Sequence, residues 1–211
     1  MLFRSAGFGR FGQVVVRVLR GLGIGATVID HDPAQIATVR RFGYKAYYGD
    51  ATRLDLLEAA GAGSAKVLLL AIDDPDAALN AVKRVRERFP HLEIVARARG
   101  RTDAYEYAAI GVPAVREVFG SALQAATLLL KVLGYEDEDT RRIVRRFREY
   151  DERQLAANAQ HRHDLGKLIA LTEQGRRDIA QLLAEESASA PQVPGGEIGR
   201  ASCRERVSLT V

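Results

Sequence analysis

The chain has 211 residues, 47% hydrophobic and 27% charged, with a formal net charge of +4, which fits one soluble globular domain plus an appendage. The single cysteine, Cys203, excludes an internal disulfide and a cysteine-cluster metal site, and we find neither a signal-peptide layout nor the roughly 18 consecutive apolar residues of a membrane helix. The basic excess is mostly arginine in one late helix, without a helix-turn-helix, zinc-finger or aromatic RNA-binding signature, so we expect no nucleic-acid partner.

Apolar runs typical of strands alternate with helical patterns along the first 120 residues. The expected strands are 1–5, 26–30, 44–48, 66–72, 92–96 and 115–119. Two of the helical patterns begin with Asp-Pro, at Asp32 and Asp74, which is an N-cap followed by proline at the first helical position. This alternation predicts an α/β, Rossmann-like doubly wound parallel sheet with strand order 3-2-1-4-5-6.

Local patterns make three finer predictions within this domain. The first run is a poor central strand, because Arg4 and Ser5 interrupt a segment that should read as consecutive aliphatic residues. Thr52, followed three residues later by Asp55, resembles a capping box. The residues expected on the buried face of the first helix are Val14, Val15, Val18, Leu19 and Leu22.

From Ser121 the pattern changes to helix only. A helix at about 139–160 carries an apolar stripe that consists of Ile143, Phe147, Tyr150 and Leu155. An apolar stripe on a helix outside the main sheet needs another surface to cover it. We interpret residues 121–186 as a helical arm that docks on a second copy of the domain, and the alternative is a helix folded back on its own sheet.

The two ends of the chain do not match the domain between them. Residues 187–211 are small, polar and rich in proline and glycine, so we expect disorder. The segment 199–207 fits neither a helix face nor a strand, and like residues 1–5 it reads as translated adapter DNA. The expected organisation is a nucleotide-binding domain at 1–120, the arm at 121–186 and a non-native tail at 187–211.

The run Gly7–Gly12 reads G-x-G-x-x-G and opens the first helix. In this motif Gly7 permits the tight turn, Gly9 lets the backbone approach a pyrophosphate, and Gly12 lets helix and strand pack closely. Asp30 ends the next apolar run, 18 residues past Gly12, where a carboxylate accepts hydrogen bonds from the hydroxyls of an adenosine ribose. The pattern predicts a nucleotide site, and the alternative is that the glycines only form a packing corner.

The acid at Asp30 argues against a 2′-phosphate, so NAD(H) or AMP/ATP is favoured over NADP(H). Sites in such sheets lie at the carboxyl ends of the strands. The candidate binding residues there, besides the three glycines and Asp30, are Arg10, Phe11, His31, Asp50, Ala51, Asp73 and Arg97.

These candidates have separate expected roles. Asp50 would accept from an adenine amino group or merely form a turn, and Asp73 would contact a distal ribose. Arg97 would reach the phosphates, the alternative being a solvated charge at a strand end. Arg10, inside the glycine loop, would reach a phosphate or an anionic ligand bound alongside.

No catalytic constellation accompanies this site. A dehydrogenase needs a second domain that presents an acid or base to the substrate, whereas the residues after Phe119 offer arginines and helices. We expect no metal site either, because His161 and His163, two residues apart on a helix, diverge. Because no such substrate-binding domain is visible, we expect a sensor rather than an enzyme. The alternative is the coenzyme-binding half of an NAD-dependent oxidoreductase.

Four motifs resemble, in the right order, the KTN (RCK, TrkA-N) domain of Kef-type potassium efflux systems, the monovalent cation:proton antiporters. They are GFGRFGQ at 7–13, VIDHDP at 28–33, YGDATR at 48–53 and ARAR at 96–99, and the resemblance covers residues 6–155. It implies a nucleotide-sensing regulatory domain at the cytoplasmic face of the bacterial inner membrane, hung from an integral-membrane antiporter. A third alternative is a peripheral TrkA-like subunit of a potassium uptake system.

The resemblance also implies ligands and partners. The domain would bind NAD(H) or AMP through the glycine loop and Asp30, and would form a homodimer through the late helix that carries Arg145-Arg146-Phe147. Glutathione-gated members bind glutathione adducts near the dimer interface with the loop arginine, here Arg10. Those members carry Asn where this chain has Arg148, a departure that weighs against glutathione control.

Overall fold

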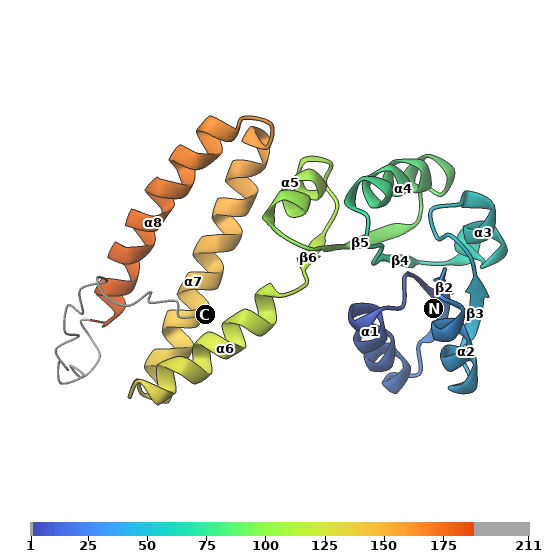
Figure 1. Ribbon diagram of the computed structural model, residues 1–211, viewed down its shortest axis with the longest axis horizontal. Coiled ribbons are helices and arrows are strands. Elements are labelled where there is room, and N and C mark those ends of the chain that lie inside the picture. Colours follow the sequence, from blue (N-terminus) through green and yellow to red (C-terminus); the bar gives the residue numbers. More distant parts are fainter. Residues whose placement is uncertain (1, 188–211) are drawn as a thin grey trace, which may run out of the picture.

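The computed structural model describes residues 2–187 (Figure 1). The tail expected at 187–211 therefore lies outside the described residues except for Ser187, as does Met1. The strands are β1 (Leu2–Ala6), β2 (Gly25–Asp30), β3 (Lys45–Tyr48), β4 (Val67–Leu70), β5 (Glu93–Ala98) and β6 (Ala114–Arg116). The helices are α1 (Arg10–Gly21), α2 (Pro33–Arg41), α3 (Leu54–Ala59), α4 (Pro75–Arg88), α5 (Arg101–Ala109), α6 (Phe119–Val132), α7 (Asp137–Asn158) and α8 (Leu165–Ser187), with short 3-10 turns at Ala62–Ser64 and Ala159–His161.

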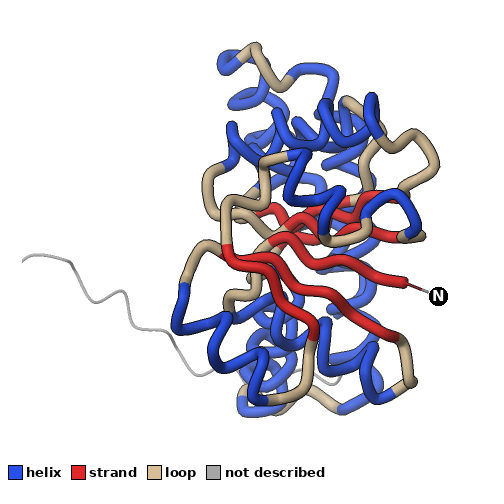
Figure 2. The backbone as a smooth tube through the Cα atoms, turned by 90° about the vertical axis from the view of Figure 1, so that its right-hand side faces the viewer, coloured by secondary structure: helices blue, strands red, loops and turns tan. Residues whose placement is uncertain are grey.

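The strands form one parallel sheet in the order β3-β2-β1-β4-β5-β6, so the predicted doubly wound topology is confirmed. Helices lie on both faces of the sheet (Figures 1 and 2): α1 and α2 cover one face, and α3, α4 and α5 cover the other. Each face has its own apolar core. Because the strand order reverses at β1, the carboxyl ends of β1 and β4 border the crevice where such folds bind ligands.

β1 is the central strand although its sequence is poor for that position. Arg4 and Ser5 are both buried, and each finds partners that make burial tolerable. The Ser5 hydroxyl donates to the Gly7 carbonyl at 2.8 Å, and the Arg4 guanidinium donates to the carbonyls of Phe3 and Gly61, each at 3.1 Å. Burial lowers the pKa of Arg4. Pairing with β2 and β4 on both edges overrides the local pattern.

The buried face of α1 agrees with the predicted one only in part. Gly12 and Val16 are the buried residues of the helix, whereas Val14, Val18 and Leu22 are exposed. The prediction joined two neighbouring stripes of the helix, one with Val14, Val18 and Leu22 and one with Val15 and Leu19. Residues four apart lie on the same side of a helix, so each stripe is a separate side. Gly12 and Val16 are the most buried, and Val15 and Leu19 are half-buried against the same core, as predicted for these two residues.

Two predicted boundaries are also wrong. Thr52 does not form a capping box with Asp55, because α3 starts two residues later and its N-cap position has no side-chain hydrogen bond. The Thr52 hydroxyl donates to Asp50 instead, at 2.8 Å. The last strand ends at Arg116 rather than 119, because the chain turns into α6 at Phe119; the Glu117 amide makes the last hydrogen bond to β5, to the Ala98 carbonyl.

The helical part packs as a layer of its own beside the sheet (Figure 1). The stripe of α7, predicted to lie on a second copy, packs within the chain against α5, α6 and α8: Ile143 is buried, and Phe147 and Leu155 are half-buried. Asp151 of α7 is buried and pairs with Arg101 and Arg116 of the sheet domain. None of the described helices combines the length and apolar character needed to cross a membrane.

Candidate functional site

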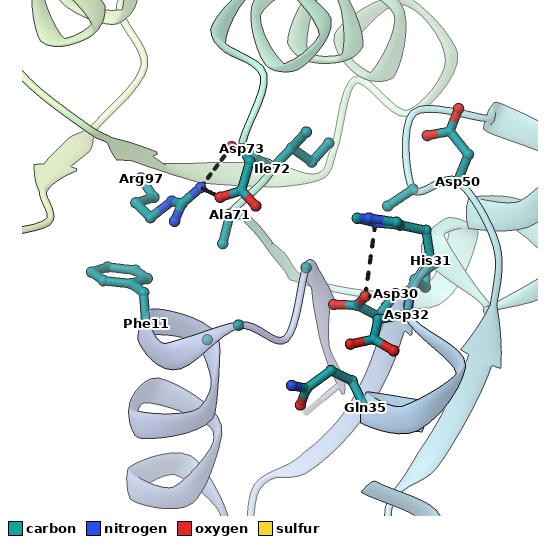
Figure 3. A pocket seen from close by; sticks show the side chains of 15 residues that line it. Phe11, Asp30, His31, Asp32, Gln35, Asp50, Ala71, Ile72, Asp73 and Arg97 are labelled. Carbon is teal, nitrogen blue, oxygen red and sulfur yellow. Dashed lines mark hydrogen bonds and ion pairs between the residues drawn. The ribbon is translucent and has the colours of Figure 1, made fainter. Parts of the chain in front are cut away.

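A cleft of about 230 Å³ lies at the carboxyl ends of β1, β2 and β4 (Figure 3). Every predicted binding residue except Arg10 lines it: Gly7, Gly9, Phe11, Gly12, Asp30, His31, Asp50, Ala51, Asp73 and Arg97. Arg10 is exposed as the first residue of α1. Its two neighbours, Gly9 and Phe11, line the cleft, whereas Arg10 does not.

The three glycines of the loop have different structural duties. Gly7 has φ +95, and a Cβ there would lie 2.4 Å from the Ala71 carbonyl oxygen. A Cβ at Gly12 would lie 2.6 Å from the Gly7 carbonyl oxygen. Neither position has room for a side chain. At Gly9, by contrast, a Cβ would meet nothing within 4 Å, so the fold leaves the space in front of this residue open.

The Gly12→Ala substitution is therefore expected to destabilise the fold by about 1–3 kcal/mol, the usual range for inserting a methyl group where there is no room. Urea unfolding followed by circular dichroism measures the effect. The control is Gly21→Ala at the other end of α1, where a Cβ has no neighbour within 4 Å and alanine favours the helix. Equal unfolding midpoints for the two variants would contradict the packing duty of Gly12.

The amino end of α1 provides an anion site. Gly9 is the N-cap, and no side chain caps the helix. The amide groups of a first helical turn lack partners within the helix, and the helix dipole adds a partial positive charge there. Backbone amides at such a position bind phosphate groups. The open space at Gly9 gives a phosphate access to this end of α1.

Asp30 lies at the end of β2 with only 7% of its surface exposed. Its Oδ2 accepts from the Phe8 amide at 2.6 Å and its Oδ1 from the Asp32 amide at 2.8 Å. Each carboxylate oxygen has two acceptor positions, so both oxygens can accept a further hydrogen bond from a ligand. Asp30 thus braces the glycine loop while it lines the cleft. The His31 Nδ1 lies 3.8 Å from the Asp30 Oδ1.

Asp50 is exposed at the rim of the cleft, beyond β3. It accepts hydrogen bonds from the amide and the hydroxyl of Thr52, both at 2.8 Å. These bonds lower the pKa of its carboxyl group. Asp50 therefore forms a turn and also contributes a charged carboxylate to the cleft, while Ala51 beside it is buried. The two roles considered from the sequence are compatible at this position.

Arg97 is not a solvated charge. Its side chain is 8% exposed, and its Nη2 donates to the Asp73 carboxylate at 2.6 Å and to the Ile72 carbonyl at 2.9 Å (Figure 3). Its Nη1 donates to Glu117 at 3.2 Å. The hydrogen bond from Arg97 lowers the pKa of Asp73. Asp74, next in the chain, caps α4 through the Ala77 amide, as its Asp-Pro pattern predicts.

Sequence reasoning did not single out Gln35 and Ala71, which also line the cleft. Gln35 lies in the first turn of α2, and its Oε1 accepts from Gln13 of α1 at 3.1 Å. Its place three residues after Asp32, at the start of the helix that follows β2, is the signal that could have found it. Ala71 contributes through its backbone against Gly7, which no side-chain pattern reveals.

A glycine loop, a helix amino end and an acid after the second strand, all at the switch point of a parallel sheet, define a Rossmann-like nucleotide-binding domain. The chain belongs to the TrkA-N domain family, whose model matches residues 6–117, and residues 121–196 match the potassium efflux system KefB C-terminal domain. The resemblance predicted from the four motifs is thereby confirmed.

Two relatives are glutathione-regulated potassium-efflux system proteins named KefC. The chain is 44% identical over 160 residues to that of Klebsiella pneumoniae, covering 74% of this chain and 26% of the relative. It is 40% identical over 182 residues to that of Escherichia coli, covering 86% of this chain and 29% of the relative. The chain therefore spans less than a third of the length of these relatives.

Two solved structures resemble the fold described above. The Shewanella denitrificans Kef C-terminal domain in its AMP-bound form is 42% identical, with a TM-score of 0.71, and the match covers 76% of this chain and 98% of that one. The TrkA-N domain of the Escherichia coli inner membrane protein YbaL is 26% identical, with a TM-score of 0.55, covering 61% and 95% of the two chains.

Proposed function

We propose that this chain is a nucleotide-sensing regulatory domain of a potassium/proton antiporter and that AMP is a ligand of its cleft. The observation that carries the proposal is the Asp30 carboxylate beside the open amino end of α1, in a chain 42% identical to a Kef C-terminal domain that was solved with AMP. In this proposal the phosphate binds the first turn of α1 and the ribose hydroxyls donate to Asp30.

The adenine then extends toward Asp50 and His31, which line the same cleft. NAD(H), the other predicted ligand, shares the adenosine half and would reach past the glycine loop toward Asp73. The chain offers binding groups for either ligand, and we propose that it senses the nucleotide without converting it. The relatives are transport proteins, which favours this role over the oxidoreductase half.

The partner in this proposal is the membrane part of an antiporter, with the domain at the cytoplasmic face of the inner membrane. A nucleotide can bias transport only if it binds two conformations of the domain with different affinities. The segment that matches this chain is less than a third of each KefC relative, which favours a domain attached to a longer protein over a peripheral TrkA-like subunit.

The test joins the domain to a transporter. In vesicles that contain a KefC relative whose matching segment is replaced by residues 6–184 of this chain, AMP is expected to change the rate of potassium efflux. The same chimera with Asp30→Ala serves as the control and should not respond to AMP. A chimera that binds AMP and transports at an unchanged rate would contradict regulation while leaving binding intact.

We also propose that the domain forms a homodimer, through α6 rather than through the stripe of α7. The large apolar side chains at the end of α6 are exposed, and they are Leu128, Leu129, Val132 and Leu133. Val115 and Val118, at the β6–α6 junction beyond the other end of α6, are exposed as well. Exposed apolar side chains gathered at the end of a helix favour a protein interface, and a second copy would bury them symmetrically.

The substitution Leu129→Asp is expected to convert this dimer into a monomer, because a charge would have to be buried without a partner. Light scattering measures the mass. The matched control is Leu165→Asp, which changes an exposed leucine of α8 and should leave the mass unchanged. A dimer that survives Leu129→Asp would contradict the α6 interface. Phe147→Asp is a poorer probe, because Phe147 packs on Phe119 within the chain.

A glutathione-type ligand near Arg10 stays a prediction. The KefC relatives carry glutathione regulation in their names, whereas this chain has Arg148 at the position where the glutathione-gated pattern has Asn. Arg10 is exposed and is not among the residues that line the cleft. An anion bound there would lie outside the proposed AMP position.

A further inference from the structure

Arg97 connects the cleft with the start of the helical arm. Its guanidinium lines the cleft and contacts two carboxylates from opposite sides, Asp73 on the β4–α4 loop at 2.6 Å and Glu117 at 3.2 Å. Asp73 is 82% exposed, whereas the Glu117 side chain is 25% exposed. Glu117 follows β6 directly, and α6 begins two residues later. One buried cation therefore joins the nucleotide site to the β6–α6 junction.

The hydrogen bonds of Arg97 are incomplete. A guanidinium has five N–H donors, and its Nε is buried with no hydrogen-bond partner among residues 2–187. A buried donor without a partner is costly, so Arg97 gains from an additional acceptor. Among its neighbours, Glu117 forms the longer of the two ion pairs. The bond to Glu117 is thus the one that a competing anion would displace most easily.

We infer that Arg97 is the positioning residue through which a nucleotide phosphate acts on the arm. The inference rests on the proposed function. A phosphate at the first turn of α1 brings a third anion close to Arg97, which lines this edge of the cleft. Arg97 turns toward the phosphate, its bond to Glu117 breaks, and the β6–α6 junction loosens. Release of Glu117 then changes the position of α6, which carries the proposed dimer surface.

The coupling is reciprocal by thermodynamic linkage. If the phosphate breaks the bond between Arg97 and Glu117, a variant in which that bond is already weak must bind AMP more tightly. Glu117→Gln keeps the size of the side chain and removes its charge. We expect the AMP dissociation constant of this variant to fall about fivefold or more, the lower end of typical coupling factors. A purely structural role for Glu117 would weaken binding or leave it unchanged.

Hydrogen–deuterium exchange on the full chain, with and without AMP, tests the inference. In the wild type AMP is expected to slow exchange at Gly9–Gly12 and to speed it about tenfold at 117–122, where a hydrogen bond to a charged group is lost. In Glu117→Gln the 117–122 amides should exchange rapidly without ligand, and AMP should protect only the glycine loop. The control Glu58→Gln, which removes a surface pair with Arg88 on α4, should behave as the wild type does.

The outcomes separate the two proposals. If AMP slows no exchange at Gly9–Gly12 in the wild type, the proposed function fails and the coupling with it. If AMP protects the loop but leaves 117–122 unchanged, or changes 117–122 equally in Glu117→Gln, nucleotide binding stands and the coupling through Arg97 is overturned.

Discussion

Asp30→Ala is expected to remove most of the thermal protection that AMP gives to this domain. Both ribose hydroxyls of the proposed complex donate to the Asp30 carboxylate, and hydrogen bonds to a charged group contribute about 1.5–3 kcal/mol each. Their loss weakens binding by about 100-fold or more. At a ligand concentration of 100 times the wild-type dissociation constant, protection falls from about 2.7 to about 0.4 kcal/mol.

Asp30 also braces the amides of Phe8 and Asp32, so Asp30→Ala lowers the melting temperature of the ligand-free domain as well. The measured quantity is therefore the AMP-induced rise in melting temperature of each variant. Asp55→Ala, which changes an exposed carboxylate paired with Arg53 outside the cleft lining, is the control and should keep the full rise. A full rise in Asp30→Ala would remove Asp30 from the site.

The same carboxylate predicts discrimination between dinucleotides. The 2′-phosphate of NADPH would face Asp30, Asp32 and Asp50, which line one end of the cleft. Like charges in such proximity repel, so NADH should raise the melting temperature more than NADPH does. Equal protection by the two would contradict the assignment of the ribose to Asp30.

Gly9→Val is expected to abolish AMP binding and to leave the fold intact. A Cβ at Gly9 meets no atom within 4 Å, and the backbone at Gly9, with φ −62 and ψ −170, is open to any residue. The valine side chain would occupy the space through which a phosphate reaches the first turn of α1. Calorimetric titration should therefore show no AMP binding, while the free energy of unfolding falls by only about 1 kcal/mol, because valine is a poorer helix N-cap residue than glycine.

The contrast with Gly12→Ala makes this prediction specific. Both variants add a side chain to the same loop, but only the one at Gly12 collides with the backbone of Gly7. Gly9→Val should abolish AMP binding with only a small loss of stability, whereas Gly12→Ala should act mainly by lowering stability. If Gly9→Val still bound AMP with the wild-type dissociation constant, the phosphate could not lie at the amino end of α1.

The sheet order and the place of the cleft could be predicted from local patterns in the sequence. Strands and helices have different periods, so their alternation is visible without knowledge of distant contacts. The spacing between Gly7–Gly12 and Asp30 is likewise a property of one strand–helix–strand unit. For this reason the predicted cleft residues lie together, with Arg10 as the exception. The tight turn at Gly7 and the close packing at Gly12 also follow from the motif.

Features that depend on contacts between distant segments could not be read in this way. Arg4 and Ser5 form part of a central strand because Gly61 and two neighbouring strands accept and pair their polar groups. Arg97 is buried because Asp73 and Glu117 reach it from 24 residues before it and 20 after it. No pattern in the sequence near Arg97 indicates that these distant residues will pair with it.

For the helical arm, too, local patterns could be predicted and contacts between distant segments could not. Its amphipathic character is periodic and therefore visible in the sequence, but the surface that covers each stripe is not. The sequence pattern assigned the stripe of α7 to a second copy, whereas the fold covers it with α5, α6 and α8 and leaves the end of α6 exposed. Periodicity determines which residues must be buried. Which surface buries them is decided by long-range packing, because several apolar surfaces compete for the same stripe.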